Sequence, residues 1–172
     1  MIRYTGYFIV GFFLAIACVS PESPESLESS KSSEQLYDSS RNAMADIDSA
    51  VYQADIGNKY VLIQVGGNWC KWCIRLHHFI ESNHRIDSII TADYVLIRVN
   101  YSKENKNSEA MKRLEFPDRF GFPVLVVMDS MGNRLHTQDT YFLEQGDSYS
   151  EEKIKRFLLS WNRKAVSPET YQ

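Results

Sequence analysis

The chain has 172 residues, which fits one ordinary domain with additional segments, because domains commonly hold roughly 100–150 residues. Hydrophobic residues make up 44% of the sequence, a share near the globular norm that allows a buried core. The formal net charge is -3, and acidic and basic residues are mixed along most of the chain. Since a nucleic-acid-binding surface would need a basic stripe, we expect no nucleic-acid partner.

An apolar run at residues 7–19 follows a single positive charge, Arg3. The run is shorter than the roughly 20 apolar residues that cross a bilayer, and it has the proportions of a secretory signal peptide. We expect this signal peptide to occupy residues 1–17. The Ala-Ile-Ala sequence at residues 15–17 satisfies the rule for ordinary cleavage. The same stretch resembles a bacterial lipobox, in which the following cysteine, Cys18, is acylated and becomes the new N-terminus.

Residues 18–40 are expected to be a disordered tether behind a lipid anchor on Cys18. From residue 20 onward this segment is rich in Ser, Glu and Pro and contains almost nothing apolar. Such a segment cannot bury enough surface to offset the entropy lost on ordering. Plain secretion and an uncleaved membrane anchor are the alternatives. We expect an extracytoplasmic location, in a bacterial periplasm or at a cell surface, with the membrane reached through the anchor.

The pattern over residues 41–164 predicts a folded domain. Apolar residues at helical spacing predict helices, and short β-branched runs predict buried strands. Ser39 or Ser40 is the expected N-cap of the first helix, and Gly57 is its expected end. In chain order we expect a helix from about residue 41, a strand at 60–65, helices after 68 and at 84–91, a strand at 94–99, a short helix from 108 to 114, strands at 123–128 and near 134–142, and a helix at 151–161.

This order describes a β-α-β unit followed by a hairpin and a closing helix around one mixed sheet. The fold class is therefore α/β, with a central sheet flanked by helices. We expect the tail, residues 165–172, to be frayed.

The sharpest functional signal is the sequence Gly-Asn-Trp-Cys-Lys-Trp-Cys at residues 67–73, between a predicted strand and a predicted helix. A thiolate attacks a disulfide, yet a free cysteine with a pKa of about 8.5 is mostly protonated at neutral pH. A helix N-terminus favours an anion at Cys70, and Lys71 adds a nearby cation. We therefore expect Cys70 to attack a partner's disulfide and Cys73 to resolve the mixed disulfide.

Two other uses of the cysteine pair stay open. His77 lies one helical turn beyond Cys73, so Cys70, Cys73 and His77 form a conceivable metal carrier, although a zinc site needs four ligands, or three and a water. A client-binding or chaperone module would hold client thiols without turnover. Heme attachment is not expected, because it needs a histidine where Ile74 stands.

The Trp69-Cys70-x-x-Cys73 motif, followed later by Phe122-Pro123 before the third strand, resembles the thioredoxin superfamily, specifically its exported single-domain members. The resemblance covers about residues 43–161. It implies a thioredoxin-like fold, thiol–disulfide exchange with protein substrates, and no cofactor or resident metal. A membrane or periplasmic redox partner must then recharge the pair.

The resemblance also assigns a substrate groove. Pro123 matches the family's cis-proline, which faces the cysteines and holds substrate backbone. We expect Trp69, Lys71, Trp72 and Phe122 to line the same groove.

Two departures from the family pattern affect the rate of disulfide exchange and the reduction potential of the cysteine pair. The dipeptide between the cysteines is Lys71-Trp72 where thioredoxin has Gly-Pro, so the reduction potential cannot be transferred. Gln64 stands where many thioredoxins keep a buried acid, which makes it the proton-transfer position. If Gln64 points inward, its amide cannot take a proton from Cys73, and resolution relies on water or another base.

Overall fold

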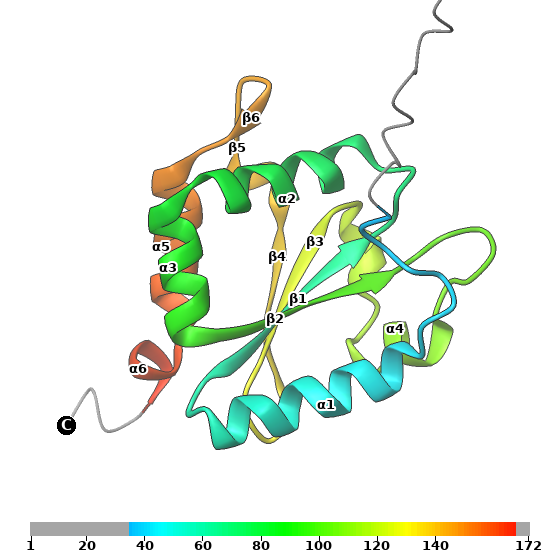
Figure 1. The fold of residues 1–172 in the computed structure, drawn as a ribbon, viewed down its shortest axis with the longest axis horizontal. Helices are drawn as coiled ribbons and strands as arrows, with labels where there is room; N and C mark the ends of the chain where they lie inside the picture. Colours follow the sequence, from blue (N-terminus) through cyan, green and yellow to red (C-terminus); the bar gives the residue numbers. More distant parts are fainter. Residues whose placement is uncertain (1–34, 168–172) are drawn as a thin grey trace, which may run out of the picture. The chain divides into compact units, whose positions relative to one another are not determined.

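The computed structural model describes residues 35–167. The expected signal peptide, Cys18 and most of the expected tether lie outside these residues. The described chain is built on a four-stranded mixed sheet with the order β2-β1-β3-β4 (Figure 1). Its strands are β1 (Tyr60–Gly66), β2 (Tyr94–Asn100), β3 (Val124–Met128) and β4 (Arg134–Asp139). β1 and β2 are parallel, whereas β3 runs antiparallel to both β1 and β4.

Helices cover both faces of this sheet, as predicted. α1 (Ala43–Ile56) and α4 (Ser108–Arg113) pack on one face, and α2 (Lys71–Ser82), α3 (His84–Asp93) and α5 (Glu151–Trp161) pack on the other (Figure 1). Elements that the sequence did not predict are the 3-10 turns η1 (Pro117–Phe120) and η2 (Thr140–Leu143), the small hairpin of β5 (Glu144–Gln145) and β6 (Ser148–Tyr149), and α6 (Arg163–Val166).

The frayed tail was predicted to begin too early. Residues 165 and 166 belong to α6, where the amide of Ala165 donates to the side chain of Asn162 at 2.9 Å. Asn162 therefore starts a further helical turn after α5. Residues 168–172 lie outside the described part of the chain.

Both faces of β1 are buried, which explains its nearly continuous apolar sequence. Val61, Ile63 and Val65 belong to the core under α1 and α4, and Leu62 belongs to the core under α2, α3 and α5. Because side chains alternate along a strand, Gln64 shares the face of Leu62. A fully buried glutamine thus lies beneath α2.

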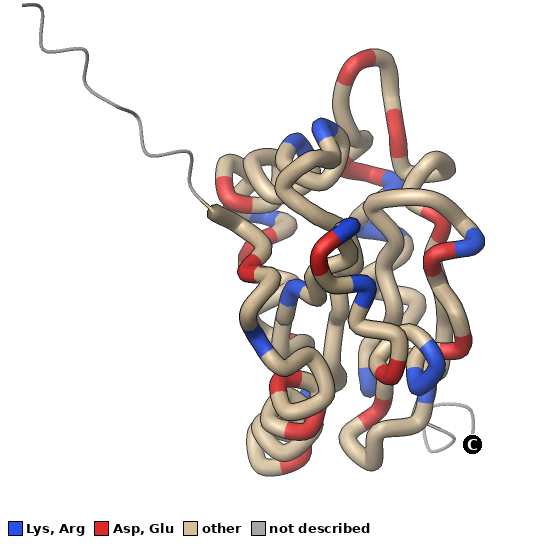
Figure 2. The backbone as a smooth tube through the Cα atoms, turned by 90° about the vertical axis from the view of Figure 1, so that its right-hand side faces the viewer, with Lys and Arg blue, Asp and Glu red and all other residues tan. Residues whose placement is uncertain are grey.

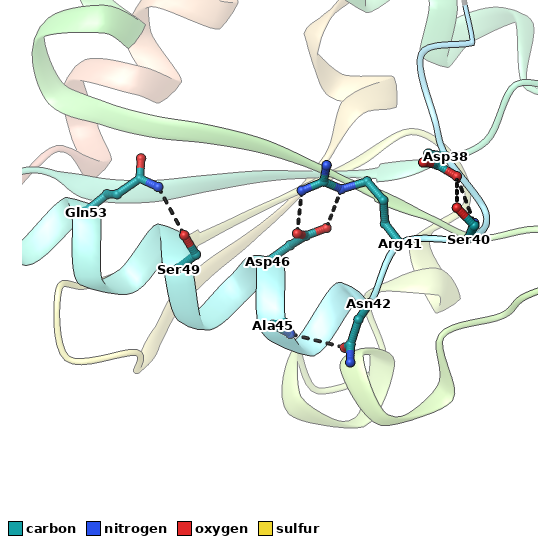
Figure 3. Close-up of polar contacts among 8 residues, drawn as sticks. All are labelled: Asp38, Ser40, Arg41, Asn42, Ala45, Asp46, Ser49 and Gln53. Atoms are coloured by element: carbon teal, nitrogen blue, oxygen red, sulfur yellow. Dashed lines mark hydrogen bonds and ion pairs between the residues drawn. The ribbon is translucent and has the colours of Figure 1, made fainter.

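The N-terminus of α1 differs from the prediction. Asn42 is the N-cap, and its side-chain oxygen accepts from the amide of Ala45 at 3.2 Å (Figure 3). Ser40 was one expected cap, but its hydroxyl donates to Asp38 at 2.7 Å, two residues away. Asn42 directly precedes the first helical residue, so its short side chain reaches the unpaired amides that a cap must satisfy.

The folded part also begins before residue 41, so the predicted tether at residues 18–40 extends too far. Tyr37 is only 1% exposed. Its amide donates to Oδ1 of Asn68 at 2.9 Å, and its carbonyl accepts from Nδ2 of Asn68 at 2.7 Å. Residues just before α1 are therefore part of the domain.

Acidic and basic residues are interspersed along the described chain (Figure 2). Within residues 35–167, none of the helices has the length and apolar character needed to span a bilayer.

We expect His136 of β4 to make the stability of the domain depend on pH. Its ring stacks on Trp161, with centroids 4.2 Å apart. Burial lowers the pKa of His136, although a hydrogen bond with Gln138 opposes the shift. As the pH falls below about 6.5, the unfolded chain takes up the proton before the folded one does, so the folded state loses stability.

We therefore expect urea denaturation to give a smaller free energy of unfolding at about pH 5 than at about pH 7. His136→Phe keeps a ring against Trp161 but does not titrate, so it should lose less stability over this interval. An equal loss in both proteins would contradict the role assigned to His136.

Candidate active site

Cys70 and Cys73 form a disulfide at the start of α2, with their Cα atoms 5.2 Å apart. Cys70 is the N-cap of this helix, and its Sγ accepts a hydrogen bond from the amide of Cys73 at 3.1 Å. The sulfur of Cys70 therefore lies where the unpaired amides and the helix dipole favour negative charge. The predicted placement of the pair at a helix start is confirmed.

The two cysteines differ in access. Cys70 is 6% exposed and Cys73 is 0% exposed. A partner's sulfur can approach the edge of Cys70, whereas Cys73 is enclosed by the protein. This difference favours Cys70 as the attacking sulfur and Cys73 as the resolving one, roles that stay predictions.

Gly66, at the end of β1, makes room for the buried sulfur. A Cβ at this position would stand 2.5 Å from Sγ of Cys73 and 2.9 Å from Oη of Tyr37. Both distances are shorter than real Cβ contacts. Glycine is therefore required by close packing, and the same geometry brings the Tyr37 hydroxyl near the Cys73 sulfur.

An aromatic wall formed by Trp69, Tyr101 and Phe122 borders the disulfide. Trp69 is 58% exposed, meets Phe122 edge-on at 5.4 Å, and donates its indole N–H to the carbonyl of Tyr101 at 2.8 Å. Phe122 also contacts Tyr101, with centroids 4.8 Å apart, and packs against the cluster that holds both cysteines. The expected groove residues Trp69 and Phe122 thus lie together beside the pair.

The Phe122–Pro123 peptide bond is cis, as predicted. Thr140, which the sequence did not single out, fixes this turn from η2, because its hydroxyl donates to the carbonyl of Pro123 at 2.5 Å. Pro123 is buried beside the aromatic wall.

The other two expected groove residues lie on α2 and are less closely associated with the wall. Trp72 is half-buried, meets Tyr149 edge-on at 5.5 Å, and carries the guanidinium of Arg75 4.5 Å from its ring centroid. Tyr149 also donates its hydroxyl to the carbonyl of Trp72 at 3.2 Å. Lys71 is exposed on the first turn. Trp72 is thus fixed on the β6 side, while Lys71 faces solvent.

Gln64 points beneath the disulfide, as predicted. Its Nε2 donates to Oη of Tyr37 at 2.6 Å and to the carbonyl of Cys73 at 3.1 Å. Its Oε1 is buried and has no hydrogen-bond partner among the described residues. The amide therefore acts as a donor that joins Tyr37 to α2, and it offers the sulfur no base.

Tyr37 is the site residue that sequence reasoning missed. It forms one buried cluster with Cys70 and Cys73, although the prediction placed it in the tether. The available signal was the adjacent apolar pair Leu36-Tyr37, at the end of an otherwise polar segment.

Comparison with known proteins agrees with this geometry. Residues 42–130, just over half of the chain, match a family model described as Thioredoxin-like. The chain belongs to the thioredoxin-like family. A search of curated proteins finds no match.

Solved structures show the same fold. The chain is similar to a disulphide isomerase from Xylella fastidiosa Temecula1, with a TM-score of 0.64 and 22% identity over 72% of this chain and 94% of that one. It is also similar to a DsbH oxidoreductase, with a TM-score of 0.50 and 18% identity over 65% of this chain and 78% of that one. The predicted thioredoxin-like fold is confirmed, and its cysteine pair at disulfide distance fits a thiol–disulfide oxidoreductase.

His77 of this thioredoxin-like domain lies on the buried face of α2, where it contacts β2 and Glu81. Its Nδ1 lies 2.8 Å from Nη2 of Arg98, and its Nε2 lies 3.2 Å from Oε2 of Glu81. A guanidinium can only donate, so Nδ1 accepts and the ring proton is on Nε2. Within residues 35–167, the one group spaced to hold a metal ion is His77, His78 and Glu81, which includes neither cysteine. The geometry does not favour the alternative in which Cys70, Cys73 and His77 act as a metal carrier.

We expect Gly66→Ala to destabilise the thioredoxin-like domain by about 1–3 kcal/mol, because the added methyl overlaps the Cys73 sulfur. Urea denaturation measures this loss. In a Cys73→Ala background the sulfur is absent, so the same change should cost less. Equal costs in the two backgrounds would show that the sulfur does not impose the glycine.

Proposed function

We propose that this protein is a thiol–disulfide oxidoreductase that exchanges disulfides with protein substrates through Cys70 and Cys73. One observation carries the proposal: the Cys70 sulfur is the N-cap acceptor of α2 and is bonded to a buried partner, Cys73. A sulfur in this place is stabilised as a thiolate, which makes it both a competent nucleophile and a good leaving group.

Atoms and electrons balance in this exchange without a cofactor. In the reduced protein, the Cys70 thiolate attacks one sulfur of a substrate disulfide, and the electron pair of the broken bond leaves on the other substrate sulfur. The Cys73 thiolate then attacks the Cys70 sulfur and releases the second substrate thiolate. The substrate gains two electrons, and the protein ends with its own disulfide. The reverse sequence oxidises a substrate dithiol.

The aromatic wall and the cis-proline support a protein substrate. The exposed indole of Trp69 and the half-buried ring of Phe122 offer apolar surface next to the reacting sulfur. Thr140 holds Pro123 at a fixed place beside that surface. An extended peptide could lie against this wall with its disulfide over Cys70, while Lys71 and Trp72 would border the groove from α2.

The cysteine variants test the assigned roles. Cys70→Ser should reduce turnover of a protein disulfide to the uncatalysed rate, because the attacking thiolate is gone. Cys73→Ser should keep the first attack and accumulate mixed disulfides, visible on non-reducing gels. Mixed disulfides formed mainly through Cys73 would reverse the roles, and substrate binding by the wild-type protein without any turnover would favour a client-binding module.

We also propose that Cys18 is acylated and holds the domain outside the cytoplasm, where a membrane or periplasmic redox partner recharges the pair. The support is the small-residue sequence before Cys18 and the polar segment after it.

Cys18→Ala should then move the full-length protein from the membrane fraction to the soluble fraction of a bacterial host. The matched measurement is the mass of the N-terminal peptide, which should carry acyl chains only when Cys18 is present. The same partitioning of both proteins, without acylation, would favour plain secretion.

A further inference from the structure

Tyr37, in the segment before α1, places its hydroxyl beside Gly66, as Cys73 does its sulfur. Its Oη and the Sγ of Cys73 lie 2.9 Å and 2.5 Å from the single point where a Cβ of Gly66 would stand. The two atoms therefore border the same point beside Gly66, and the two residues belong to one buried cluster that water does not reach. Tyr37 is 1% exposed and Cys73 is 0% exposed.

The hydrogen bond from Gln64 determines how the phenol can act. Because Nε2 of Gln64 donates to Oη of Tyr37 at 2.6 Å, the phenolic oxygen is the acceptor in that contact. A hydroxyl also has one proton to donate. The sulfur of Cys73 borders the same point beside Gly66 as this oxygen, so it is a candidate acceptor for that proton.

We infer that Tyr37 is a positioning residue for the resolving step, whose O–H donates a hydrogen bond to the thiolate of Cys73. This inference rests on the proposed function. The hydrogen bond stabilises the charged form of a sulfur that has no solvent, so a larger fraction of Cys73 is ready to attack the mixed disulfide at neutral pH.

Tyr37 acts as a donor and not as a base. Burial raises the pKa of its phenol, while the charge of Arg98 and the hydrogen bond from Gln64 lower it less. The other titratable group that acts on the phenol is Tyr149. Tyr37 thus keeps its own proton at neutral pH. The proton that Cys73 loses passes to the departing substrate thiolate, so the step balances without proton transfer to tyrosine.

Hydrogen bonds order the backbone at Tyr37 and the chain that follows it. Asn68, two residues before Cys70, forms two hydrogen bonds with the backbone of Tyr37. After Tyr37, Arg41 pairs with Asp46 at 2.5 Å, and the side chain of Asn42 caps α1 (Figure 3). A donor fixed in this way needs little reorganisation when charge develops on the sulfur.

Stopped-flow reaction with an aromatic disulfide that releases a coloured thiolate separates the two steps. The reduced protein should release one thiolate when Cys70 attacks and a second when Cys73 resolves the mixed disulfide. In Tyr37→Phe we expect the first phase to be unchanged and the second to be about tenfold slower near neutral pH. The deficit should vanish at high pH, where Cys73 is a thiolate without help.

Tyr94→Phe is the matched control. Tyr94 is also buried and donates its hydroxyl to the carbonyl of Leu158 at 2.6 Å, in a core cluster that does not include the cysteines. Removing this hydroxyl costs a buried hydrogen bond as well, so both variants should be destabilised. Only Tyr37→Phe should change the pH profile of the second phase.

An equal second-phase rate in Tyr37→Phe and wild type would overturn the inference and leave the proposed function intact. A deficit of the same size at every pH would also overturn it, because it would point to packing alone. If the wild-type protein gives no first phase, the proposed function fails and this inference fails with it.

Discussion

At the N-terminus of α2, the amide of Cys73 donates a hydrogen bond to the sulfur of Cys70, and much of the domain serves to hold this contact in place. β1 ends just before the loop that leads to α2, and Gly66, at the end of β1, leaves the space that the Cys73 sulfur occupies. Asn68 ties the intervening loop to the segment before α1. A sulfur held as a helix cap is poised for negative charge, which is the property that thiol–disulfide exchange needs.

The elements and the reactive pair could be predicted because local sequence determines them. The β1 sequence is almost continuously apolar since both faces are covered, and the Trp-Cys-x-x-Cys motif falls where the strand gives way to a helix. The cis peptide at Phe122–Pro123 followed from the family resemblance and not from spacing. Gln64 could be placed beneath the site because side chains alternate along a strand.

The parts that escaped prediction depend on contacts between distant segments. Tyr37 lies at the end of a Ser/Glu-rich stretch, and its burial and its hydrogen bonds with Asn68 and Gln64 show that it belongs to the domain. The contact of Arg98 with His77 joins β2 to α2, and no local sequence pattern predicts this contact. The buried layer under the disulfide thus combines a glutamine that donates hydrogen bonds with a tyrosine that lies before the predicted start of the domain.

The reduction potential of the Cys70–Cys73 couple, measured by equilibration in glutathione redox buffers, tests the central claim most directly. Redox-active pairs of this kind fall between about -270 and -120 mV, whereas structural disulfides of secreted proteins lie below about -300 mV. A helix-capping sulfur that is stabilised as a thiolate predicts a reversible two-electron couple within the first range. A potential below about -300 mV, or a disulfide that does not re-form after reduction, would contradict the account.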